Sequence, residues 1–155
     1  MPWIENIPLE NVAKGQHHAC GENSMLIQIS DHDMAFPTPK HQFKEVHQFT
    51  FLDIEEESDF AITDAQAAEL VRLLQHAWEN RMNVVVHCHA GICRSGAVCE
   101  IGVMMGFDDC ERFRIPNLLV KHKMMRALGW TYDSEEKTYE VNGTVNEWGF
   151  IMPKH

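Results

Sequence analysis

A cysteine and an arginine separated by five residues are the groups in this chain whose types and spacing could do chemistry. The three β-branched residues 84–86 predict a buried strand, and His87 and Cys88 follow them directly. A helical pattern over 97–105 begins just after Arg94. A turn from a strand into a helix aims several backbone N–H groups and the positive end of the helix dipole at one point, which makes an anion site. The guanidinium of Arg94 can hold two oxygens of a phosphate, and the same donors stabilise a thiolate. We therefore expect Cys88 to be a nucleophile near neutral pH.

The stretch from His87 to Ser95 has the form His-Cys, any five residues, Arg-Ser, and it resembles the signature loop of the cysteine-dependent protein tyrosine and dual-specificity phosphatases. The resemblance implies that Cys88 is the nucleophile and Arg94 the phosphate clamp, in a reaction that forms a phosphocysteine intermediate and uses no metal or other cofactor. It also implies that Ser95 hydrogen-bonds the sulfur and helps it leave, and that His87 helps to hold the thiolate form. The residues that would bind phosphate through their backbone N–H groups are His89, Ala90, Gly91, Ile92 and Cys93.

A carboxylic acid should face this loop, because the alkoxide or phenoxide that leaves a phosphate ester needs a proton. In the phosphatases that the chain resembles, this acid is an aspartate on a mobile loop upstream of the cysteine. Asp53 is the first choice, because it follows a predicted strand, 46–52, that runs parallel to the strand before Cys88. Asp59 is the alternative acid if its loop folds back, whereas Asp64 fits a helix start better. A further possibility is that these acids only form a solvated loop.

The step Pro116-Asn117 resembles a proline-asparagine pair that begins a late helix in dual-specificity phosphatases and braces the phosphate loop. The glycine and phenylalanine that follow in that family are replaced here by the apolar residues 118–120. Asn117 is therefore either a support of the phosphate loop or a simple N-cap of the helix.

Alternating strand and helix patterns predict the fold that positions these residues. The order is typical of an α/β protein with a mainly parallel central sheet flanked by helices, as in dual-specificity phosphatases. Strands are expected at 24–30, 46–52 and 84–86. Helices are expected at 9–14, where Gly15 ends the helix, from the capping box of Thr63 and Gln66 onward, at 97–105 and within 108–114. A last helix is expected after Asn117, and its inward residues are Val120, Met124, Ala127 and Leu128. The pair Asn142-Gly143 between alternating runs predicts a small C-terminal β-hairpin over 137–148.

The composition suits one phosphatase domain over residues 1–155, because a chain that is 45% hydrophobic at this length can bury a sizeable core. A net charge of −10 argues against nucleic acid as a partner, so a phosphate site would be a local positive focus on an acidic body. No stretch has the apolar length of a membrane span, and we expect no membrane partner. The basic residues 121–123 are expected on a solvated helix face or on a rim that attracts phosphorylated substrates.

Five cysteines, an odd number, include three that crowd one turn and its helix, which fits a reducing compartment and predicts a cytoplasmic protein. Cys93 lies five positions after Cys88, the offset that low-molecular-weight tyrosine phosphatases have between their nucleophile and a loop cysteine. A nearby thiol can capture the sulfenic acid that peroxide forms on a thiolate. Cys93 is thus either a redox partner of Cys88 or a residue that only fills space, and Cys99 is a weaker candidate.

Ten histidines raise the possibility of a metal site, above all at 17–20 and at 87–89. A zinc site needs four ligands at workable spacing, and alternate side chains at a strand end point to opposite faces. We therefore expect no metal ligands here, and we expect His89 to border the pocket.

The function that these residues favour is hydrolysis of phosphomonoesters, first of phosphotyrosine in proteins and next of phosphoserine and phosphothreonine. The partners would be phosphorylated proteins or peptides, with phosphate, sulfate or vanadate as inhibitors. RNA 5′-triphosphate and phosphoinositide hydrolysis use the same kind of loop. A phosphate-binding module without catalysis is the alternative of a different class, and sulfur transfer or arsenate reduction is a more distant one.

Overall fold

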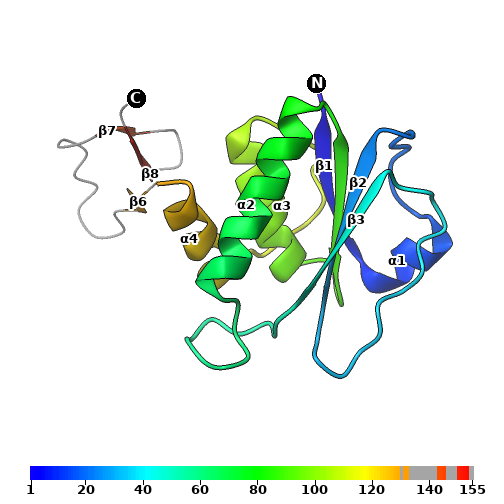
Figure 1. The fold of residues 1–155 in the computed structure, drawn as a ribbon, viewed down its shortest axis with the longest axis horizontal. Helices are drawn as coiled ribbons and strands as arrows, with labels where there is room; N and C mark the ends of the chain where they lie inside the picture. Colours follow the sequence, from blue (N-terminus) through cyan, green and yellow to red (C-terminus); the bar gives the residue numbers. More distant parts are fainter. Residues whose placement is uncertain (130, 133–142, 146–149, 154–155) are drawn as a thin grey trace.

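A central sheet of five parallel strands, in the order β3-β2-β4-β1-β5, organises the computed structural model, which describes residues 1–129, 131–132, 143–145 and 150–153. The strands are β1 (Trp3–Pro8), β2 (Ser24–Ser30), β3 (Glu45–Thr50), β4 (Asn83–Cys88) and β5 (Asp108–Asp109). The helices are α1 (Leu9–Lys14), α2 (Asp64–Glu79), α3 (Arg94–Met105) and α4 (Leu118–Ala127). Figure 1 shows α2 and α3 on one side of the sheet and α1 on the other. The predicted α/β class with a mainly parallel sheet is confirmed.

Two apolar clusters fill the space between the sheet and its helices. Val84 and Val86 of β4 belong to the larger cluster, beneath α2, α3 and α4, whereas Val85 belongs to the smaller one beside α1. Successive side chains of a strand face opposite sides, so a strand that is covered on both faces needs apolar residues at every position. This is why the unbroken valine run predicted a buried strand correctly.

Local signals predicted several element boundaries well. Strand β2 has the expected bounds, and α1 ends at Gly15, whose φ of 70° is the left-handed conformation that glycine adopts without strain. At the start of α2, the hydroxyl of Thr63 accepts from the backbone N–H of Gln66 at 3.0 Å, and the Gln66 side chain accepts from the N–H of Thr63 at 2.9 Å. Strand β3 ends earlier than expected, so two residues separate it from Asp53.

One strand was not expected from the sequence, and two expectations about the elements were wrong. The weakly patterned N-terminus forms β1 in the interior of the sheet, where the buried polar residues Glu5 and Asn6 interrupt the usual apolar pattern. The expected helix within 108–114 is instead β5 and a segment without regular secondary structure, in which Glu111 has a φ of 60° that a right-handed helix does not tolerate. Ala127 is exposed at the end of α4, where the helix passes beyond the core, and Met125 is buried in its place.

The expected C-terminal hairpin around Asn142-Gly143 rests on residues 137–142 and 146–148, which lie outside the described part of the chain. Three short strands are described there: β6 (Thr131–Tyr132), β7 (Gly143–Val145) and β8 (Phe150–Pro153). They pair antiparallel in the order β6-β8-β7. Over the described residues, no helix combines the length and apolar character that crossing a membrane requires.

Candidate active site

The loop between β4 and α3 brings the signature residues together. Cys88 is the last residue of β4 and Arg94 the first of α3, so residues 89–93 make the turn between them. The backbone N–H of Gly91 donates to Sγ of Cys88 at 3.3 Å, and Oγ of Ser95 lies 3.2 Å from the same sulfur. Donors that surround a sulfur favour its thiolate form. The arrangement therefore suits a nucleophilic cysteine.

Strand β1 supports this loop from below. Gly91 has a φ of 75°, and a Cβ there would lie 2.3 Å from the backbone of Ile7 and Pro8, so only glycine fits. The side-chain amide of Asn6 donates to the carbonyl oxygen of Gly91 at 2.7 Å, and the backbone N–H of Leu9 donates to that of His89 at 3.1 Å. Asn6 is a supporting residue that the sequence analysis missed. The only sign of this role in the sequence was that Asn6, a polar residue, lies within a stretch that could form a strand.

The guanidinium of Arg94 is held by two groups through only one of its three nitrogens, Nη1. Its Nη1 donates to Oδ1 of Asp31 at 2.7 Å and to the carbonyl oxygen of Phe51 at 2.8 Å. Its Nε is buried and has no hydrogen-bond partner among the residues that the structure describes. A buried cationic donor without an acceptor is costly, so this edge of the side chain suits an anion. Asp31, which orients Arg94, is another residue that the sequence analysis missed.

A pocket of about 240 Å³ opens above the cysteine. Its lining consists of Asp31, Met34, Asp53, Cys88, His89, Ala90, Cys93 and Arg94. Both aspartates considered as acids are exposed, but the structure brings only Asp53 into this wall, and Asp59 is absent from the lining. His89 borders the pocket, as expected.

Asn117 combines the two alternatives that the sequence left open. Its Oδ1 accepts from the N–H of Val120 at 3.0 Å, which caps α4. Its Nδ2 donates to Oδ1 of Asp53 at 2.7 Å and to the carbonyl oxygen of Ile54 at 3.1 Å. Its backbone N–H donates to the carbonyl oxygen of Cys93 at 2.9 Å. Through its side chain and its backbone N–H, this one buried residue thus caps a helix and links the phosphate loop to Asp53.

His87 is fully buried beneath the loop. Burial lowers the pKa of its imidazole to about 4, so the ring is neutral near pH 7. Its Nδ1 lies 3.3 Å from the carbonyl oxygen of Cys88 and donates to it in the neutral ring. A neutral ring brings no positive charge to the sulfur, so any support from His87 comes from fixing the backbone of Cys88.

The two cysteines considered as redox partners differ in their surroundings. Cys93 is partly exposed in the pocket wall, where burial, and next the carboxylate of Asp53, raise the pKa of its thiol. Cys99 faces the core, where burial raises the pKa of its thiol to about 12 and its Sγ donates to the carbonyl oxygen of Ile4 at 3.7 Å. Only Cys93 of the two is accessible from the pocket.

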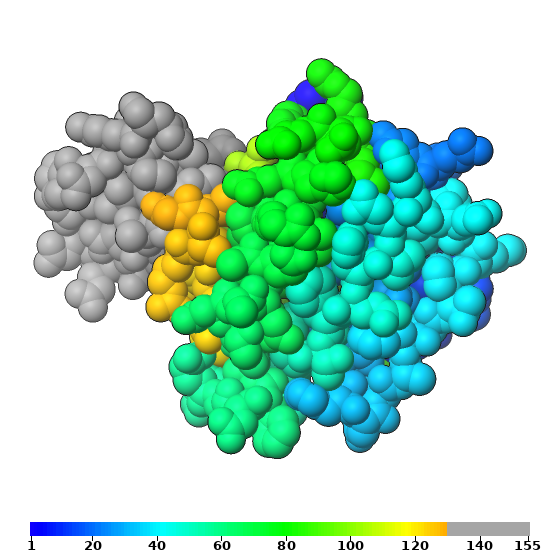
Figure 2. All heavy atoms as spheres, in the orientation of Figure 1, coloured from blue at the N-terminus to red at the C-terminus, as the bar shows by residue number. Residues whose placement is uncertain are grey.

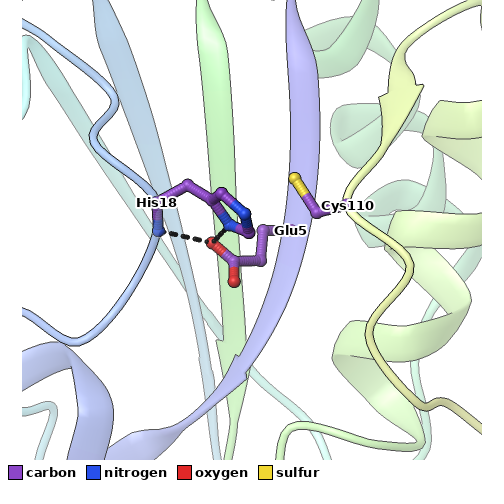
Figure 3. Close-up of side chains that lie close together, drawn as sticks. All are labelled: Glu5, His18 and Cys110. Carbon is purple, nitrogen blue, oxygen red and sulfur yellow. Dashed lines mark hydrogen bonds and ion pairs between the residues drawn. The ribbon is translucent and has the colours of Figure 1, made fainter.

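A second group of titratable side chains lies on the α1 side of the sheet, around the buried carboxylate of Glu5 (Figure 3). Oε1 of Glu5 accepts from the backbone N–H of His18 at 2.9 Å and lies 3.0 Å from its Nδ1, while Oε2 pairs with Nε of Arg112 at 2.9 Å. Cys110 completes the cluster. Arg112 and His18 already satisfy both carboxylate oxygens, so the cluster is explained as an ion-pair network that ties two loops to β1.

Comparison with known proteins identifies the family. A profile of the protein-tyrosine phosphatase family matches residues 16–138, which include the Cys88 loop. No curated protein sequence matches significantly. Among solved structures, the chain is similar to OH1 from the Orf virus, which is described as a tyrosine phosphatase with distinct structural features and triple substrate specificity. The TM-score is 0.47 and the sequence identity 18%, and the match covers 68% of this chain and 57% of that chain. The chain thus spans little more than half the length of that structure. Since the family profile covers most of its sequence, the chain belongs to the protein-tyrosine phosphatase family.

Proposed function

We propose that this protein hydrolyses phosphomonoesters through a phosphocysteine intermediate, with phosphotyrosine in proteins as its preferred substrate and phosphoserine and phosphothreonine next. The observation that carries the proposal is the convergence on one pocket of three groups: the Cys88 sulfur, the guanidinium of Arg94, whose buried Nε has no hydrogen-bond partner among the described residues, and the carboxyl group of Asp53. Membership of the family supports the same reaction.

In the first step, the Cys88 thiolate attacks phosphorus and the P–O bond to the leaving group breaks. The leaving oxygen takes a proton from the carboxylic acid of Asp53, while Arg94 and the loop N–H groups bind the phosphoryl oxygens. In the second step, water attacks the phosphocysteine, gives a proton to the Asp53 carboxylate, and the P–S bond breaks to release phosphate. The hydroxyl of Ser95, 3.2 Å from the sulfur, stabilises the departing thiolate.

Turnover of p-nitrophenyl phosphate is the direct test of this function. We expect activity that vanadate abolishes, that phosphate and sulfate inhibit competitively, and that a chelator leaves unchanged. A protein that binds phosphate tightly but shows no turnover would instead be the binding module. Initial rates on phosphotyrosine, phosphoserine and phosphothreonine peptides, on a phosphoinositide and on an RNA 5′-triphosphate would then rank the substrates.

The acid assignment predicts a specific kinetic loss. Asp53→Asn should lower kcat/KM by about 10² to 10⁴, because the leaving group loses its proton donor. The alkaline limb of the pH–rate profile should flatten, since that limb reports deprotonation of the acid. The loss should shrink for substrates whose leaving group needs no proton. Asp59→Asn is the control and should behave like the wild type; the reverse pattern would make Asp59 the acid.

The thiol of Cys93 predicts recovery from oxidation. Peroxide should oxidise Cys88 to a sulfenic acid, and Cys93 should then displace its hydroxyl as water to form a Cys88–Cys93 disulfide. Mass spectrometry should detect this disulfide, and a dithiol should restore activity. Cys93→Ser should keep its turnover but lose the recovery, whereas Cys99→Ser, the matched core variant, should recover. Full recovery of Cys93→Ser would show that Cys93 only fills space.

A further inference from the structure

The loop that carries Asp53 is attached to α4 along its length. Besides the bonds from Asn117 to Asp53 and Ile54, the backbone N–H of Leu118 donates to Oε2 of Glu55 at 2.7 Å. Figure 2 shows the teal atoms of this loop below α2 and next to the orange atoms of α4. The first turn of α4 therefore holds the first part of the loop.

Lys123, one turn further along α4, holds the second part. Its side chain is only 4% exposed, although this basic run was expected on a solvated helix face or on a rim that attracts substrates. Its Nζ donates to the carbonyl oxygen of Ile62 at 2.9 Å, and lies 2.5 Å from Oε1 of Glu57 and 3.4 Å from Oδ1 of Asp64. A buried ammonium group is tolerated only where such acceptors surround it. Its removal leaves the carbonyl oxygen of Ile62 without this donor and breaks the ion pairs with the exposed carboxylates of Glu57 in the loop and Asp64 at the start of α2.

The loop is also closed at its base. The backbone N–H of Leu52 donates to the carbonyl oxygen of Phe60 at 2.8 Å, and Nη1 of Arg94 donates to that of Phe51. A segment that is pinned at its base, its first part and its second part has few ways to swing out without breaking several hydrogen bonds. Asp53 is thereby kept at the pocket wall.

We propose that Lys123 is a positioning residue for the acid: it holds the loop so that Asp53 faces the pocket throughout turnover, without a separate closing movement. The proposal rests on the proposed role of Asp53. Its physical basis is that catalysis by a positioned group is sensitive to small displacements, of which about 1 Å can cost about a hundredfold in rate.

The test is the dependence of kcat/KM on the leaving group. Lys123→Met keeps the unbranched stem and removes the ammonium. It should lower kcat/KM about 10- to 100-fold for phenyl phosphate, whose leaving group needs a proton, and by less than about threefold for p-nitrophenyl phosphate. The matched control is Lys121→Met, which removes the 2.6 Å ion pair that Lys121, on the same helix, makes with Glu100 of α3. Its ratio of the two rates should equal that of the wild type.

Two further variants keep the test informative if Lys123→Met folds poorly. Glu57→Ala removes an exposed loop partner of Lys123 and should change the ratio of kcat/KM for the two esters in the same direction as Lys123→Met, by a smaller factor. Lys123→Arg keeps a cation and should have the wild-type ratio. Added to Asp53→Asn, Lys123→Met should change the ratio no further. The inference is wrong, and the proposed function stands, if Asp53→Asn changes the ratio but Lys123→Met and Glu57→Ala do not. If the wild type hydrolyses neither ester, both proposals are overturned.

Discussion

Cys88→Ser is expected to abolish turnover while the protein still binds phosphate. The serine hydroxyl fits the space of the thiol and can accept the hydrogen bond that Gly91 donates to the sulfur. It is not ionised near neutral pH, however, and an alcohol without a general base beside it is a poor nucleophile. Removal of a nucleophile typically costs about 10⁴-fold or more in kcat. Steady-state rates with p-nitrophenyl phosphate and calorimetric titration with inorganic phosphate measure the two properties separately.

Cys110→Ser is the matched control for the nucleophile. Cys110 is also unpaired, but it lies beside Glu5, outside the pocket, so its replacement should leave turnover close to that of the wild type. Substantial turnover by Cys88→Ser would contradict the nucleophile assignment. Loss of both turnover and phosphate binding would point instead to a collapsed loop, which circular dichroism and a thermal melt would reveal.

Arg94→Lys should be almost as damaging, although the charge is conserved. A guanidinium can offer two parallel N–H donors to a phosphate, whereas an ammonium group is a point donor. In Arg94, Nη1 is already engaged by Asp31 and Phe51, so Nε and Nη2 form the edge that can offer two parallel donors to the substrate. Two lost charge-assisted hydrogen bonds of about 1.5–3 kcal/mol each correspond to a fall in kcat/KM of about 10² to 10⁴.

Arg112→Lys makes the same chemical change outside the pocket. The guanidinium of Arg112 pairs with Glu5 on the other side of the sheet, so this variant should retain wild-type kcat/KM. The kcat/KM values of Arg94→Lys and Arg112→Lys should be measured over the same series of pH values. A general loss of stability would lower kcat/KM in both variants. Wild-type kinetics in Arg94→Lys would remove the clamp assignment.

The sequence by itself determined the parts of this protein that depend on neighbouring residues. The valine run, the small residues of the loop and the helical pattern that follows lie within one short stretch, so local signals were enough to place Cys88 and Arg94 at the two ends of one turn. The capping box of α2 and the glycine end of α1 are equally local, and both were predicted correctly.

Only the tertiary structure decided how polar side chains from distant segments meet. Asn6 supports Gly91 from 85 positions away, and Asp31 orients Arg94 from 63 positions away. A polar residue can be buried only where another segment supplies its hydrogen-bond partner, and hydrophobic periodicity carries no record of that partner. For this reason β1 with its polar residues looked unlike a core strand. Lys123 looked like a solvated residue for the same reason, because its acceptors are supplied by the acid loop and the start of α2.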